Sequence, residues 1–173
     1  MKPGRVRVWD LPVRLTHWGV AAGVAAAWWF SDGGWHERIG YAVAACVAAR
    51  LAWGCVGTRH ARFGDFVRGP GATMAYARRL LTGSEPRYLG HNPLGGWMAL
   101  VLWAAVALTC LTGWLYTTDA YFGEPWLDRL HQAAAWTVVA LVPLHLAGVW
   151  FTSRRHRENL VAAMLHGDKR SPD

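Results

Sequence analysis

Residues 130–153 read LHQAAAWTVVALVPLHLAGVWFTS, and this segment is the most informative part of the chain about its fold. It contains no charged side chain, yet it carries two histidines, His131 and His145. At 1.5 Å per residue a helix needs roughly 20 apolar residues to cross the hydrocarbon core of a bilayer, which is about 30 Å thick. The stretch is longer than that, so it predicts a transmembrane helix with two ionisable side chains inside it.

Three further apolar runs accompany this one along the chain of 173 residues. Residues 15–31 and 88–118 contain no charged residue, and residues 39–57 are interrupted only by Arg50. A soluble helix would show a polar face at every turn, which these runs do not. Most of the 12 tryptophans fall near the run ends, where an indole ring is favoured at the headgroup level. We therefore predict an all-α, integral membrane four-helix bundle. It forms a single domain over residues 1–173, with spans at about 12–30, 35–57, 93–117 and 126–152.

The segments between the runs predict how the helices begin and what joins them. Asp10 is a possible cap for the first helix, and Pro12 lies in its first turn, where a missing N–H costs nothing. Residues 72–81 are expected to form a short helix on the membrane surface, and the tail after the fourth span is amphipathic. Bulky tryptophans follow the first apolar run in place of a small-residue cleavage site, so we do not interpret the N-terminus as a signal peptide. Gly19 and Gly23 form a GxxxG step that favours close helix packing.

The distribution of Lys and Arg residues along the chain predicts the membrane topology. Of the 18 Lys and Arg residues, 15 lie in the N-terminal segment, in the connector at 59–92 and in the C-terminal tail. The two opposite loops hold only Arg38 and Arg129 and are otherwise acidic. Because basic loops stay in the cytoplasm, both termini are predicted there, in a bacterial inner membrane. The basic residues flank spans without a nucleic-acid motif, so no nucleic-acid partner is expected beside membrane lipid.

A histidine inside a transmembrane span is energetically unfavourable, so its presence indicates a function. His131 and His145 are 14 residues apart, which brings them within about 40° of one helix face at depths that differ by roughly 21 Å. His36 lies at a depth like that of His131, and His17 lies near the level of His145. Two histidine pairs at two depths favour bis-imidazole ligation of haem iron.

Other metals fit these residues less well. A di-iron carboxylate site needs inward Glu residues, and the apolar runs contain none. The two histidine pairs lie too far apart for one tetrahedral zinc site. The three cysteines form neither a CxxC pair nor a CxxCH motif, which argues against a disulfide and against covalent haem. His91 remains a rival to His17 as the inner ligand, and Arg50 either pairs with a carboxylate of the inner haem or snorkels to the interface.

Several motifs together resemble one family over residues 7–169. They are VWDLPVRLTHW (8–18), HERIGY (36–41), RLAWG (50–54), RFGDF (62–66), GHNPLGGWM (90–98), LTGWL (111–115), LHQAAAW (130–136), PLHLAGV (143–149) and SRRHRENLVAAM (153–164). This set resembles the bacterial cytochrome b561 and nickel-iron hydrogenase b-type cytochrome family. The resemblance implies two b-type haems, with His17 and His145 as one ligand pair and His36 and His131 as the other. Hydrogenase-linked members usually carry an additional span, so the four spans predicted here favour the shorter type.

The function expected from these features is electron transfer between the quinone pool and a periplasmic partner such as a c-type cytochrome, with quinone as a further ligand. Two alternatives stay open. The chain is then either a haem-bearing anchor subunit of a larger oxidoreductase complex or a superoxide:quinone oxidoreductase. Superoxide would favour a positively charged entrance, and the outer loops are acidic, so that reaction ranks below simple electron relay.

Overall fold

The computed structural model describes residues 4–31 and 33–171, which divide into two compact units. The unit that contains both chain ends, here called the terminal unit, comprises Met1–Arg14, Ala52–Leu100 and Leu144–Asp173. The other, here called the helical unit, comprises Leu15–Leu51 and Val101–Pro143. Each unit has its own core and is described by itself.

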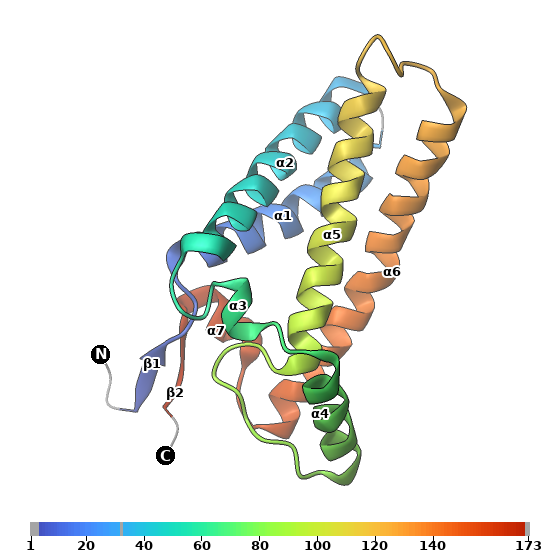
Figure 1. Ribbon diagram of the computed structural model, residues 1–173. Helices are drawn as coiled ribbons and strands as arrows, with labels where there is room; N and C mark the ends of the chain where they lie inside the picture. The colour runs from blue at the N-terminus through green and yellow to red at the C-terminus, as the bar shows by residue number, and fades with distance from the viewer. Residues whose placement is uncertain (1–3, 32, 172–173) are drawn as a thin grey trace. The chain divides into compact units, whose positions relative to one another are not determined.

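Four long helices coincide with the four predicted spans to within a few residues at each end (Figure 1). They are α1 (Leu11–Trp29), α2 (Gly33–Val56), α5 (Pro93–Tyr116) and α6 (Pro125–Arg155). The last three are long and apolar enough to cross a membrane. Only 22%, 17% and 11% of their apolar windows are buried inside the protein, which leaves most of their surface to contact lipid. Helix α1 has 19 residues and falls outside this group, so its crossing of the membrane stays a prediction.

The helix ends follow the local sequence. Asp10 Oδ1 accepts a hydrogen bond from the backbone N–H of Val13 (2.9 Å), which is the geometry of an N-cap. The same carboxylate accepts from Trp53 Nε1 (2.8 Å) and Thr58 Oγ1 (2.6 Å), so it also joins the start of α1 to the end of α2. Helices α5 and α6 both begin with proline, whose fixed φ suits a first turn.

Three short helices complete the helical part: α3 (Phe63–Phe66), α4 (Pro70–Thr82) and α7 (Leu160–His166). Helix α4 contains the predicted surface helix at 72–81, and α7 forms within the amphipathic tail. Gly83 ends α4 with φ +71° and Gly167 ends α7 with φ +92°, both in the left-handed region that glycine tolerates.

A small antiparallel sheet near the chain ends was not predicted. Strand β1 (Arg5–Arg7) pairs with β2 (Asp168–Arg170), and Val6 lies opposite Lys169. The pairing continues where Gly167 O accepts from the N–H groups of Val8 and Trp9, both at 2.9 Å. Residues 5–9 and 167–170 are thereby held together by backbone hydrogen bonds.

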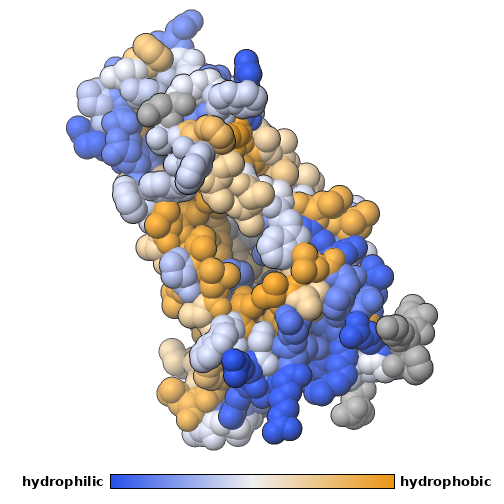
Figure 2. All heavy atoms as spheres, turned by 180° about the vertical axis from the view of Figure 1, so that it is seen from behind, coloured by the Kyte–Doolittle hydropathy of each residue, from blue (hydrophilic) through white to orange (hydrophobic). Residues whose placement is uncertain are grey.

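The two cores have different compositions. In the terminal unit one cluster of buried side chains comes from residues 8–13, from the turn before α3 and from α7. Its members are Val8, Trp9, Val13, Ala61 and Ala163. In the helical unit they come from α2, α5 and α6: Val43, Val47, Ala105, Val106 and Val138, with Val20 and Val24 of α1 packed against them. Four helices thus share one core there, which confirms the predicted helical bundle. Apolar side chains also cover much of the visible outer surface in Figure 2.

Gly19 and Gly23 bring α1 and α2 close together, as the GxxxG step predicts. A Cβ added at Gly19 would lie 3.1 Å from Cys46 Sγ, and one added at Gly23 would overlap Val43 Cγ2. Neither position accepts a side chain without displacement of α2.

Candidate functional site

The helical unit brings His36 and His131 together. His36 lies in the first turn of α2 and His131 in the second turn of α6. Their ring centroids are 6.1 Å apart, and the ring planes meet at 82°. Residues almost one hundred positions apart in sequence therefore form one histidine pair, the pair expected from matched depth.

Hydrogen bonds determine which nitrogen of each ring carries the proton. His36 Nδ1 lies 3.1 Å from the carbonyl oxygens of Ala27 and Phe30, at the end of α1. His131 Nδ1 lies 3.1 Å from the Thr109 carbonyl oxygen. A carbonyl only accepts, so Nδ1 must donate in both rings. Nε2 of each ring is then the nitrogen that can offer a lone pair to a metal, which is the arrangement that backbone carbonyls impose on metal-bound histidines when they accept from the other ring nitrogen.

This pair fits an axial ligand set for haem iron. A bond between imidazole and a transition metal is about 2 Å long, and a ring centroid lies about 1 Å behind its nitrogen, so two rings on one metal have centroids about 6 Å apart. The observed separation is 6.1 Å. Among residues 4–31 and 33–171, no three His, Cys, Asp or Glu side chains cluster closely enough to hold a metal, so the two rings stand as a pair.

Helix α5 forms the wall beside His131. Gly113 lies so close that an added Cβ would be 3.1 Å from His131 Cε1 and 3.4 Å from Nδ1. One residue earlier, Thr112 Oγ1 lies 3.1 Å from the same Nδ1. Sequence reasoning did not identify Thr112. The signal that points to Thr112 is a pair of threonines, Thr109 and Thr112, one turn apart in an otherwise apolar run.

The other two predicted ligands lie in separate units. His17 belongs to the helical unit, where its ring packs edge-on against Trp18 with centroids 5.0 Å apart. His145 lies on α6 in the terminal unit. Their pairing stays a prediction.

The rival ligand His91 lies in an aromatic cluster of the terminal unit. Its ring centroid is 4.8 Å from that of Trp9 and 4.5 Å from that of Phe66. Two large rings therefore border the imidazole, which gives it a packing role.

Arg50 is buried in the helical unit, with 3% of its surface exposed. Its guanidinium carbon lies 5.9 Å from the ring centroid of Trp103 on α5, within the range of a cation–π contact. The side chain thus points into the protein, where a carboxylate of a bound cofactor would find a fixed positive charge.

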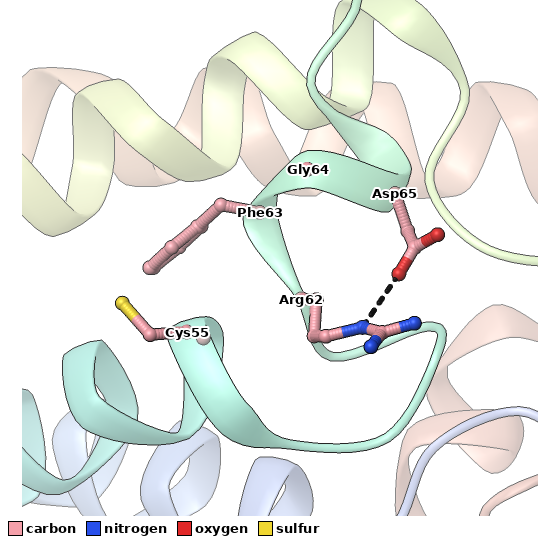
Figure 3. A pocket seen from close by; sticks show the side chains of 6 residues that line it. Cys55, Arg62, Phe63, Gly64 and Asp65 are labelled. Atoms are coloured by element: carbon pink, nitrogen blue, oxygen red, sulfur yellow. Dashed lines mark hydrogen bonds and ion pairs between the residues drawn. The ribbon is translucent and has the colours of Figure 1, made fainter.

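A surface pocket also exists at the end of α2 (Figure 3). It is lined by Gly54, Cys55, Arg62, Phe63, Gly64 and Asp65. Arg62 Nε donates to Asp65 Oδ2 at 2.9 Å across its rim. The lining contains no histidine, so this pocket offers no axial ligand for haem.

Sequence comparison places these features in a family context. A model of the family described as prokaryotic cytochrome b561 matches residues 8–167. The probable Ni/Fe-hydrogenase B-type cytochrome subunit of Cupriavidus necator is 25% identical over 210 aligned residues, which cover 92% of this chain and 85% of the relative. The protein of the same description from Azotobacter vinelandii is 24% identical over 159 residues, which cover 76% of this chain and 65% of the relative. No solved structure matches this chain significantly.

Proposed function

This chain belongs to the prokaryotic cytochrome b561 family, and from that premise we propose that it is a diheme cytochrome that transfers electrons between the quinone pool and a periplasmic redox partner such as a c-type cytochrome. It is a multi-pass membrane protein and a b-type cytochrome, for which the family implies haem b. The number of haems, their ligands and the partners are the proposed part.

The geometry of His36 and His131 carries the proposal. Two rings with free Nε2 lone pairs, 6.1 Å apart, are suited to bind one iron from opposite sides. The carbonyls of Ala27, Phe30 and Thr109 hold the two rings in this tautomer. When bound, haem supplies reversible one-electron chemistry between ferric and ferrous iron. The protein contributes the ligands, their orientation and a low-dielectric surrounding.

A second haem is proposed between His17 and His145. The resemblance assigns this pair, and the spacing of the two α6 histidines separates the two sites by roughly 21 Å along the helix axis. Two haems at two depths would carry an electron across most of the membrane. Arg50, which is buried, is proposed to lie beside a carboxylate of the inner haem, because an anion placed next to a buried cation is stabilised by it.

The orientation follows from the basic residues. With 15 of 18 Lys and Arg residues in the N-terminal segment, the connector and the tail, we place both termini in the cytoplasm of a bacterial inner membrane. His36 and His131 then lie near the periplasmic side, where they would exchange electrons with a soluble partner. The inner pair lies nearer the cytoplasmic side, which leaves quinone as its natural partner within the bilayer.

A second candidate function is that of a haem-bearing membrane subunit of a larger oxidoreductase complex. The observation that favours it is the description of both relatives as probable Ni/Fe-hydrogenase B-type cytochrome subunits. In that case the haems would serve a bound catalytic partner. Affinity purification in mild detergent separates the two candidates, because a stoichiometric dehydrogenase or hydrogenase subunit would favour the complex.

The proposal is tested by haem content. Purified protein is expected to contain about two b-type haems per chain in a pyridine haemochrome assay. Each of His17→Ala, His36→Ala, His131→Ala and His145→Ala should lose one haem, and His156→Ala in the tail, as the control, should lose none. A colourless wild-type protein would refute the cytochrome function. Full haem retention in His17→Ala together with loss in a His91→Ala variant would move the inner ligand to His91.

A further inference from the structure

Thr112 is buried on α5 at the ligand His131. It exposes 2% of its surface, and Oγ1 lies 3.1 Å from His131 Nδ1. The hydroxyl has one hydrogen, and the shortest acceptor within its reach is the Leu108 carbonyl at 2.8 Å. With that hydrogen committed to the helix backbone, Oγ1 presents its lone pairs to the Nδ1 proton of His131.

His131 Nδ1–H is therefore shared between two acceptors. One is the Thr109 carbonyl oxygen at 3.1 Å and the other is Thr112 Oγ1 at the same distance. The acceptors at His36 Nδ1 are the backbone carbonyls of Ala27 and Phe30. Of the acceptors described for the two rings, the Thr112 hydroxyl is the one that belongs to a side chain. A substitution can therefore remove this hydrogen bond and leave the backbone acceptors in place.

We propose that Thr112 is a positioning residue that lowers the reduction potential of the outer haem through its hydrogen bond to His131; this inference rests on the proposed ligation by His36 and His131. An acceptor at Nδ1–H increases the electron density of the imidazole and makes Nε2 a more basic ligand. A more basic axial ligand stabilises ferric iron relative to ferrous iron, which lowers the potential. Loss of the acceptor raises it.

The burial of Thr112 makes the effect measurable. A water molecule that could replace the hydroxyl needs room and two or more polar partners. The space between Gly113 and the His131 ring is too small for a methyl group, since an added Cβ would be 3.1 Å from His131 Cε1. Removal of the hydroxyl is therefore not compensated by solvent.

The test compares Thr112→Val with Thr137→Val. Valine replaces the hydroxyl by a methyl group of similar size, so packing is nearly unchanged. The Thr137 hydroxyl donates to the Ala133 carbonyl four residues earlier on α6 at 2.8 Å, as the Thr112 hydroxyl donates to the Leu108 carbonyl four residues earlier on α5. Thr137→Val is thus a matched control for loss of a threonine hydroxyl that bonds to its own helix.

Redox titration of the reduced haem absorption band is the measurement, and the His36→Ala variant, which lacks the outer haem, assigns the two midpoints. In Thr112→Val the outer haem is expected to show a three- to tenfold higher ratio of reduced to oxidised iron at a fixed potential; tenfold corresponds to about 59 mV. Thr137→Val and Thr112→Ser, which restores the hydroxyl, are expected to match the wild type.

The outcomes separate the inference from the function. A Thr112→Val protein with two haems and an unchanged outer midpoint would overturn the role of Thr112 and leave the diheme proposal standing. An equal shift of both midpoints would overturn it as well, because it would indicate a global change. If the valine variant retains no outer haem, Thr112→Cys is measured in its place, because its sulfur is a weaker acceptor than the hydroxyl. A raised outer-haem midpoint in Thr112→Cys supports the proposed role of Thr112, and a wild-type midpoint overturns it. A wild-type protein without haem would refute the proposed function itself.

Discussion

Gly113 shows how the absence of a Cβ can leave room for a neighbouring ring. The His131 ring is held by acceptors at Nδ1 on one side and lies against the α5 backbone at Gly113. A ring with hydrogen bonds to a helix has little freedom to move away from a new neighbour. The absence of a Cβ at Gly113 therefore supports the ring orientation on which ligation would depend.

We expect Gly113→Ala to weaken haem binding at the outer site. The added Cβ would lie 3.1 Å from His131 Cε1, so the ring must shift by a few tenths of an ångström and lengthen its bonds to Thr109 and Thr112. Haem content per chain should fall towards one. Gly148→Ala on α6 is the control, because its Cβ would meet no atom within 4 Å. Two tightly bound haems in Gly113→Ala would show that the ring position tolerates this change.

At the scale of elements, the contact between α1 and α2 depends on Gly23. Alanine there would place its Cβ on Val43, a buried core residue of α2. Overpacking of this kind typically lowers the free energy of unfolding by about 1–3 kcal/mol. Denaturant titration followed by tryptophan fluorescence should show this loss for Gly23→Ala, and little change for Gly40→Ala, whose Cβ would meet open space.

A double variant tests the cause of that loss. Val43→Ala removes the side chain that the new methyl group would strike, so Gly23→Ala should cost less in the Val43→Ala background than in the wild type. Additive losses would mean that the loss in Gly23→Ala does not arise from the contact with Val43.

The pairing of β1 with β2 is supported by one side chain, Glu158, which contacts two residues of β2. Glu158 accepts from Arg87 Nη2 (2.8 Å) and the Arg170 backbone N–H (3.1 Å), and it lies 3.5 Å from Lys169 Nζ. Burial raises the pKa of the Glu158 carboxyl, but the Arg87 hydrogen bond, the Lys169 charge and the Arg170 N–H outweigh it and hold the pKa below its usual value. The ionised carboxylate is therefore the stabilising form.

Glu158→Gln should destabilise the protein by about 1–3 kcal/mol at neutral pH, since charged hydrogen bonds are lost in a part-buried site. A lowered pKa contributes stability that is present above the unfolded value of 4.5 and is lost as pH falls through the folded value. The difference between variant and wild type should thus shrink below pH 4.5. Thermal unfolding in detergent at pH 7 and pH 4 measures it. Asp65→Asn, which breaks the more exposed pair with Arg62, is the control and should cost at most about 0.5 kcal/mol.

At the scale of the whole molecule, the apolar runs predicted the long helices to within a few residues, because a span of uncharged residues has few alternatives to a helix in lipid. The pairing of Arg5–Arg7 with Asp168–Arg170 could not be predicted, since both strands are short and charged and their contact joins opposite ends of the chain. Matched depth predicted that His36 and His131 would meet. It could not predict the carbonyls of Ala27 and Phe30 at His36, because their position depends on how the turn after α1 folds.

The orientation in the membrane is the property of the whole chain that most constrains its partners. Fusion of green fluorescent protein to the C-terminus should give a fluorescent product, because this reporter folds in the cytoplasm, and alkaline phosphatase fused there should be inactive. A phosphatase inserted between Asp119 and Glu124, in the acidic segment between α5 and α6, should be active. The opposite pattern would place His36 and His131 on the cytoplasmic side and would exclude a periplasmic electron partner at the outer haem. If α1 does not cross the membrane, a reporter fused before it and one fused after α6 would report opposite sides, because only three spans would separate them.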